Sequence, residues 1–217
     1  MILRIISAMT QLVRPGDRVG VGNGLRARKR DETRRRIAAA AVDLVTEQGI
    51  PATTVEQIAE LAGVGRATFF RYFESKELAI AAGLNDVAIY VFTATVRDLP
   101  AGLGALDAVR AAQRVLAEDF DELRPMYLEQ ALLSRSSSAM TAWTLYLYVE
   151  WEVAIADAVR PRFDDLVPGD PRPRMVGAMT MAATRLAVDE WVATDGRGDL
   201  PELIERHLAP FEVRGMQ

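Results

Sequence analysis

The chain has 217 residues, half of them apolar, with no cysteine and a formal net charge of −4. The lack of cysteine excludes disulfides, thiolate metal sites and cysteine nucleophiles. No apolar run reaches the roughly 18 residues of a membrane span, and the short apolar stretch after Met1 is broken by Arg4. We therefore expect a cytoplasmic protein without a signal peptide.

Charge is distributed unevenly along the chain. Residues 1–76 carry 13 Lys and Arg against 8 Asp and Glu, whereas residues 77–217 carry 13 against 22. A basic front and an acidic rear indicate that only the front part meets a phosphate-bearing partner.

The first 25 residues contain a Pro-Gly pair and three further glycines, so a flexible extension is predicted there. Seven Lys or Arg follow within residues 26–36, either as a solvated charge run or as an arm that touches phosphate. We favour the phosphate-contacting arm because the run lies directly before a predicted helix-turn-helix. A first helix is predicted from Asp31 to Gln48, ended by Gly49 and Pro51.

Two short helices separated by a glycine turn are predicted next. Thr54 begins the first, and Gln57 three positions on completes a capping box. Gly63 supplies the turn, and a third helix is predicted from Gly65 to Tyr72. This pattern is typical of a helix-turn-helix whose second helix enters the DNA major groove, although the turn alone also fits an ordinary helical hairpin.

Longer helices are predicted in the rest of the chain. A fourth helix, capped by Ser75, is expected to run to about Arg97. The others are expected over residues 105–123, 125–134, 138–159, 175–194 and 201–208, with a loop at 164–174. Since no strand pattern competes, the predicted fold class is all-α with about nine helices.

Many residues between positions 33 and 78 fit one family pattern in register. They are Thr33, Ile37, Ala40, Ala41, Gly49, Thr53, Thr54, Ile58, Ala59, Ala62, Gly63, Val64, Thr68, Phe70, Tyr72, Phe73, Ser75, Lys76 and Leu78. In these positions the chain resembles the TetR family of bacterial transcription regulators. The resemblance implies a DNA-binding head (26–78) on a helical effector-binding and dimerisation domain (79–217). It also implies a ligand-responsive repressor that binds a palindromic operator as a homodimer.

Only the first turn of a recognition helix reaches base edges, so base contacts are predicted for Gly65, Arg66, Ala67 and Thr68. Arg66 is the expected main reader because its guanidinium matches guanine O6 and N7, worth roughly 1–3 kcal/mol of discrimination. A plain phosphate contact is the alternative for Arg66. Phosphate contacts are predicted for Thr33, Thr54, Arg71, Tyr72 and Lys76. Phe70 stands where many family members have tyrosine, so its contact is expected to be apolar, for example with a thymine methyl.

For the rear half, the resemblance implies a dimer interface on the last two long helices, with monomer core as the alternative. The residues assigned to this interface are Met179, Ala182, Ala183, Leu186, Trp191, Leu203 and Leu208. It also implies an effector cavity, for which plain core is the alternative. The residues assigned to this cavity are Tyr90, Met126, Tyr127, Trp143, Tyr146, Leu147 and Trp151. The expected effector is a small apolar or aromatic molecule, of which a fatty acyl or lipid-like compound is one kind.

Two other classes of function stay open. An enzyme is disfavoured because the usual nucleophile–base pairs and most zinc sites need a cysteine or a second histidine. The chain has no cysteine, and its only histidine, His207, lies on the terminal helix. The acidic pairs Asp164-Asp165 and Asp189-Glu190 have no glycine-rich phosphate loop nearby. An architectural DNA-binding protein without an effector would show weak sequence preference and salt-dominated affinity. An activator also stays open, and no metal or cofactor is predicted.

Overall fold

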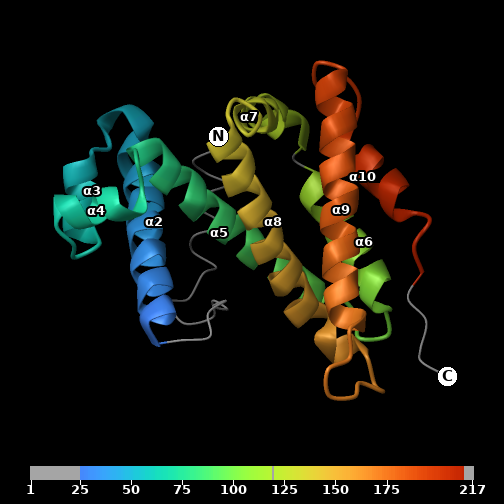
Figure 1. Ribbon diagram of the computed structural model, residues 1–217. Coiled ribbons are helices and arrows are strands. Elements are labelled where there is room, and N and C mark those ends of the chain that lie inside the picture. The colour runs from blue at the N-terminus through green and yellow to red at the C-terminus, as the bar shows by residue number, and fades with distance from the viewer. Residues whose placement is uncertain (1–24, 119, 213–217) are drawn as a thin grey trace. The chain divides into compact units, whose positions relative to one another are not determined.

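The computed structural model describes residues 25–118 and 120–212, apart from the side chains of residues 25–28, 122, 123, 126, 133 and 139. Of the extension predicted over residues 1–25, Leu25 is the first residue of a helix, and residues 1–24 lie outside this range. Within it the chain is helical and contains no strand, which confirms the all-α prediction (Figure 1). The elements are α2 (Leu25–Ala52), α3 (Val55–Leu61), α4 (Arg66–Tyr72), α5 (Lys76–Asp98), α6 (Ala105–Ala117), α7 (Phe120–Leu133), α8 (Ser138–Val159), the 3-10 turn η1 (Arg160–Arg162), α9 (Arg172–Ala193) and α10 (Leu200–Leu208).

The chain divides into two compact units between Val91 and Phe92, inside α5. The sequence placed its division after residue 78, at the start of the same helix. The division by packing lies further along because the first part of α5 belongs to the core of the first unit, where Ala79, Ile80 and Ala82 are buried.

In the first unit, α2 begins earlier than predicted and is interrupted where predicted. It starts at Leu25 rather than Asp31, and Gly49 has φ 80° and ψ 163°, a conformation that breaks the helix. The buried side of α2 includes Ile37, Ala41 and Val45, which recur at helical spacing. The helix α3 packs against α2.

The crossing of α5 over α2 depends on Gly83. A Cβ built at Gly83 would lie 2.3 Å from the carbonyl oxygen of Ala38 and 2.5 Å from Cγ2 of Val42. These distances are far inside van der Waals contact, and one of the two atoms belongs to the backbone of α2. Only glycine therefore allows the two helices to approach this closely.

The second unit is built around α8 and α9, which run side by side (Figure 1). They touch at Gly177, where a Cβ would meet the carbonyl oxygen of Glu152 at 2.2 Å. Ile155 and Val159 of α8 and Val176 of α9 are fully buried together with residues of α6. A second cluster joins Phe120 of α7 to Trp191 of α9, whose rings meet edge to face at 5.8 Å.

The helix expected over residues 105–123 begins at Ala105 as predicted, but its predicted end is wrong. The structure ends α6 at Ala117 and begins α7 at Phe120, so Pro125 lies inside α7 instead of opening it. The break allows Phe120 to turn into the core against Trp191, and this tertiary contact leaves no local sequence signal.

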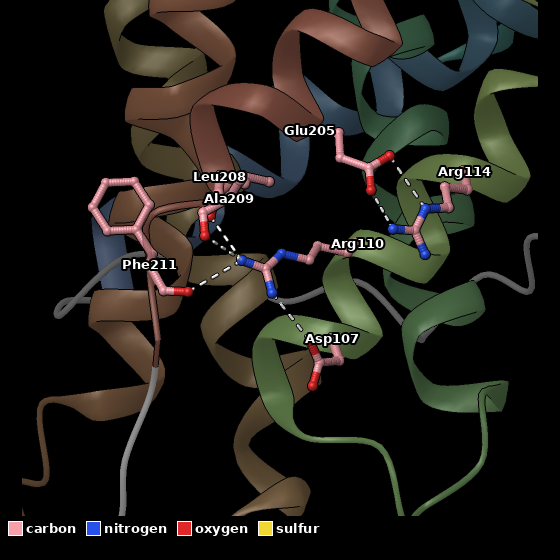
Figure 2. Close-up of polar contacts among 7 residues, drawn as sticks. All are labelled: Asp107, Arg110, Arg114, Glu205, Leu208, Ala209 and Phe211. Atoms are coloured by element: carbon pink, nitrogen blue, oxygen red, sulfur yellow. Dashed lines mark hydrogen bonds and ion pairs between the residues drawn. The ribbon is translucent and has the colours of Figure 1, made fainter.

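Arg110 holds the end of α10 against α6 (Figure 2). Its Nη2 donates to the carbonyl oxygens of Leu208 at 2.8 Å and Phe211 at 3.1 Å, while its Nη1 contacts Oδ1 of Asp107 at 3.1 Å. The last carbonyls of a helix have no partner within it, and a guanidinium also suits the negative end of the helix dipole. One turn along α6, Arg114 pairs with Glu205, which adds a second tie between the two helices.

By length and composition, α5 is the one helix in the described ranges that is apolar enough to cross a membrane. It is also a core helix, since Ala79 and Ala82 are fully buried in the first unit and Val96 in the second.

Candidate nucleic-acid interface

The first helix of the helix-turn-helix, α3, is fixed at its start by the predicted capping box. The Thr54 hydroxyl accepts from the backbone N–H of Gln57 at 3.3 Å, and Oε1 of Gln57 accepts from the backbone N–H of Thr54 at 2.9 Å. On the inner side of α3, Ile58 and Ala59 are buried. The position of α3 is therefore set both by its cap and by its core contacts.

The turn after α3 also forms as predicted. Gly63 has φ 64°, and the backbone N–H of Val64 donates to the carbonyl of Ala59 at 2.9 Å. Gly65 then takes an extended conformation and precedes α4, so that the helix begins at Arg66. Figure 1 shows α3 and α4 together beside α2. Phe69 on the inner face of α4 is fully buried, which fixes the rotation of this short helix.

All four predicted base-contacting residues lie together at the start of α4. Gly65, Arg66 and Ala67 are exposed, and Thr68 is partly exposed. The Arg66 side chain is 66% exposed and is the longest of the four. This first turn is therefore free to approach a flat or grooved partner while Phe69 holds it from behind.

Two neighbours orient the Arg66 guanidinium. Its Nη1 lies 2.8 Å from Oε1 of Glu56 in α3, and its Cζ lies 5.5 Å from the centre of the Phe70 ring. Phe70 is 45% exposed, and its ring meets the buried Phe69 ring edge to face at 5.4 Å. The sequence identified Arg66 and Phe70 but missed Glu56, since α3 and α4 had no predicted relative orientation.

Three of the residues predicted to contact phosphate already use their polar groups in hydrogen bonds within the protein. The Thr54 hydroxyl is used in the capping box, and the Thr33 hydroxyl donates to the Lys29 carbonyl one turn earlier at 2.9 Å. Nζ of Lys76 donates to the carbonyls of Ile50 at 2.9 Å and Thr53 at 2.7 Å. Lys76 thus closes the end of α2, a structural role that the sequence did not indicate.

Arg71 and Tyr72 follow on the last turn of α4. Arg71 is exposed, and its Cζ lies 5.4 Å from the centre of the partly exposed Tyr72 ring. In the basic run on α2, Lys29 and Arg30 are exposed, while Arg34 lies over the Phe73 ring at 5.7 Å. The side chains of residues 26 and 28 lie outside the described residues. The first unit therefore presents basic side chains from both α2 and α4.

The structure separates the residues predicted for the dimer interface. Ala182 and Leu186 are exposed on α9, and Met179 of α9 and Leu203 of α10 are partly exposed. Three others face the core of their own unit: Ala183, Trp191 and Leu208 are at most 2% exposed. Periodicity did not distinguish these two sets because core and interface residues share the same helical spacing.

The residues predicted for an effector cavity are likewise spread over different surroundings. Leu147 is buried and Trp151 packs edge to face on Phe92 at 5.6 Å, whereas Tyr127 and Tyr146 are exposed. Trp143 is partly exposed, Tyr90 belongs to the first unit, and the Met126 side chain lies outside the described residues. An open depression of about 550 Å³ in the second unit is lined by none of them. Its lining residues are Pro125, Leu128, Glu129, Leu132 and Ser136.

Three of the four acidic residues weighed for enzyme chemistry, namely Asp165, Asp189 and Glu190, take part in ion pairs. Asp165 pairs with Arg172 at 2.9 Å, and Asp189 pairs with Arg135 and Arg185. His207 lies 3.1 Å from Glu190. Hydrogen bonds from Arg206 and from His207 hold the pKa of Glu190 below its ordinary value, so this carboxyl stays ionised. Within residues 25–118 and 120–212 no group of three His, Asp or Glu side chains is placed to hold a metal ion.

Known proteins resemble both units of the chain. Residues 37–82 match the family model "Bacterial regulatory proteins, tetR family", and residues 103–214 match the model "MftR C-terminal domain". The HTH-type transcriptional regulator TcmR of Streptomyces glaucescens is 34% identical over 176 residues, 78% of this chain and 77% of that protein. The putative mycofactocin biosynthesis transcriptional regulator MftR of Mycobacterium tuberculosis is 26% identical over 189 residues, 87% of this chain and 92% of that protein.

A solved structure shows the same fold. The TetR family transcriptional repressor FadR of Thermus thermophilus, in complex with lauroyl-CoA, superposes with a TM-score of 0.52 at 25% identity. The match covers 84% of this chain and 97% of that one. Together with the capped α3, the glycine turn and the exposed start of α4, these similarities show that the chain belongs to the TetR family of DNA-binding transcriptional regulators.

Proposed function

We propose that this regulator is a ligand-responsive repressor that binds a near-palindromic operator as a homodimer. Arg66 makes the main base contact, supported by Gly65, Ala67 and Thr68. The single observation that carries the proposal is the start of α4, where a long exposed cation stands on a short helix fixed by the buried Phe69. A guanidinium in this place matches the two acceptors that guanine offers in the major groove.

Residues of both α4 and α3 contact the DNA backbone. Arg71 and Tyr72 act from α4, and Thr54 acts from the start of α3, where the helix dipole favours an anion. Thr33 and Lys76 contribute once their present hydrogen bonds are shared with phosphate. An apolar contact from Phe70 to a thymine methyl is available to the part of its ring that Arg66 leaves exposed.

The homodimer uses the outward side of α9. Met175, Met179, Ala182 and Leu186 recur every three or four residues there, and Leu186 is 46% exposed. On the neighbouring α8, Leu145 and Val149 are exposed as well. Apolar side chains repeated at helical spacing on two adjacent helices are a surface that a second copy would cover.

The effector is a small molecule with a large apolar part, and a fatty acyl thioester is the first class to test. Support comes from the FadR relative, whose structure contains lauroyl-CoA, and from the aromatic content of α8, which carries Trp143, Tyr146 and Trp151. The response is a population shift, in which the ligand binds the form with low DNA affinity more tightly than the form with high affinity.

Selection of bound duplexes from random DNA tests the proposal. A dimer with Arg66 as base reader yields an inverted repeat with a fixed guanine in each half-site, and Arg66→Ala loses the preference at that guanine. Operator affinity is then measured with and without saturating acyl-CoA of several chain lengths. Equal affinity with every acyl-CoA argues against this effector class, and an affinity governed by salt alone favours the architectural alternative.

A further inference from the structure

Glu56 is placed to control what Arg66 binds. It lies in the first turn of α3, next to the capping box, and its side chain is 60% exposed. Its carboxylate meets Nη1 of Arg66 at 2.8 Å, across the turn that joins α3 to α4. Buried residues, Ile58 in α3 and Phe69 in α4, hold both helices, so the backbone positions from which the two side chains meet are set by the fold of the head.

Phe70 holds the same guanidinium from another direction. The Cζ of Arg66 lies 5.5 Å from the centre of the Phe70 ring, and that ring is itself braced by an edge-to-face contact with Phe69. A carboxylate at Nη1 and a ring beneath Cζ restrict both the direction and the reach of an otherwise flexible side chain. Figure 1 shows α3 and α4 lying close together, and the contact between Glu56 and Arg66 joins the two helices.

The pair leaves one side of the guanidinium open. Among the residues that the structure describes, Nε and Nη2 of Arg66 have no acceptor. These two nitrogens carry parallel N–H groups, the arrangement that binds two acceptors at once. Guanine offers a neutral acceptor pair of this kind in O6 and N7, so Arg66 can bind guanine while it stays paired with Glu56.

A phosphate beside Arg66 would be bound less favourably than a guanine. Its oxygens carry negative charge, and the Glu56 carboxylate beside Arg66 repels them. The net charge that Arg66 presents to the DNA backbone is thereby reduced, whereas its hydrogen-bonding capacity toward a neutral base edge is kept. Specificity is a difference between two affinities, and it rises when the unwanted partner is repelled.

We propose that Glu56 is a specificity-determining positioning residue, which directs Nε and Nη2 of Arg66 toward guanine and disfavours their use on phosphate. This inference rests on the proposed function of α4 as the recognition helix. It adds a residue from α3 to the apparatus that sets sequence preference, and it gives Phe70 the role of a support beneath the guanidinium.

The test compares Glu56→Gln with Glu60→Gln in the full-length chain. Both variants remove one negative charge from α3, and Glu60 is also exposed but does not contact Arg66. Affinity is measured for the selected operator, for the same operator with the guanine replaced, and for random duplex. Thermal unfolding of each variant shows that the head stays folded.

For Glu56→Gln we expect tighter binding to random duplex and a ratio of operator to guanine-replaced affinity that falls roughly fivefold, the upper range of coupling in exposed ion pairs. Glu60→Gln raises both affinities alike and keeps the ratio. In an Arg66→Ala background, Glu56→Gln has no further effect on the ratio.

An unchanged ratio in Glu56→Gln, or an equal fall in Glu60→Gln, overturns the inference while leaving DNA recognition by α4 in place. If the unmodified protein shows no preference for any duplex, the proposed function fails and this inference fails with it. If Arg66→Ala keeps the guanine preference, Arg66 is not the base reader, and a role for Glu56 acting through Arg66 is refuted.

Discussion

Replacing Lys76 by methionine separates structural support from DNA contact in the head. Lys76 was predicted to contact phosphate, and in the structure its ammonium donates to the Ile50 and Thr53 carbonyls at 2.9 and 2.7 Å. Methionine keeps the apolar stem and removes both hydrogen bonds. A hydrogen bond to a charged group contributes about 1.5–3 kcal/mol, and less where water can replace the donor. Because the Ile50 contact is exposed, we expect a total loss of about 2 kcal/mol.

The loss is local, so the assay is chosen to locate it. Hydrogen exchange of the peptides that cover residues 49–58 should accelerate in Lys76→Met, since the end of α2 and the start of α3 lose their shared tie. The urea midpoint should fall by about 1 M if unfolding is cooperative and the urea dependence is near 2 kcal/mol per molar. All three tryptophans lie beyond residue 91, so circular dichroism is the better probe of the head.

Arg71→Met is the matched control, because it also removes one positive charge. Arg71 is exposed and its guanidinium lies over Tyr72, without a tie to another helix. We expect its stability to change by less than about 0.5 kcal/mol while its DNA affinity falls with a smaller salt slope. If exchange over residues 49–58 and the urea midpoint are unchanged in Lys76→Met, the structural role assigned to Lys76 is refuted.

Three further substitutions test other parts of the molecule. Gly83→Ala places a Cβ against the Ala38 carbonyl, so it should destabilise the head by about 1–3 kcal/mol in thermal unfolding; an unchanged melting temperature would mean that α5 shifts freely. Leu186→Glu puts a charge on the outward side of α9 and should convert the proposed dimer to monomer in analytical ultracentrifugation, whereas a dimer of unchanged affinity would place the interface elsewhere. Arg172 lowers the pKa of Asp170 from its ordinary 3.8 to about 2, so their pair stabilises the folded state above pH 4 and this contribution is lost as pH falls toward 2. Asp170→Asn should therefore lower the urea midpoint at pH 6 and lower it by roughly half as much at pH 3, and an equal effect at both values would contradict the assignment.

Local signals in the sequence predicted the helix-turn-helix well. Thr54 and Gln57 form the capping box, Gly49 and Gly63 take positive φ, and Ser137 caps α8 at the start predicted for that helix. Each of these features depends on a few neighbouring residues, so it is visible in the sequence without knowledge of the fold.

The sequence did not show in the same way which side chains face the core, an interface or another helix. Trp191 fits an interface or a core equally by spacing, and only the packing of Phe120 beside it shows that it is core. That same contact explains why α7 begins at Phe120, before the residue 125 at which this helix was expected to begin. The pairing of Glu56 with Arg66 and the closure of α2 by Lys76 both join different helices, and a sequence pattern does not fix which side chains of two helices meet.

Selection of bound duplexes from random DNA, carried out with the unmodified protein and with Arg66→Ala, tests the central claim most directly. The start of α4 as a base-reading surface, present twice in a dimer, predicts an inverted repeat with one guanine per half-site. Arg66→Ala is predicted to lose that guanine and keep the rest of the repeat. Recovery of unselected sequences by a protein that sediments as a monomer would contradict the claim.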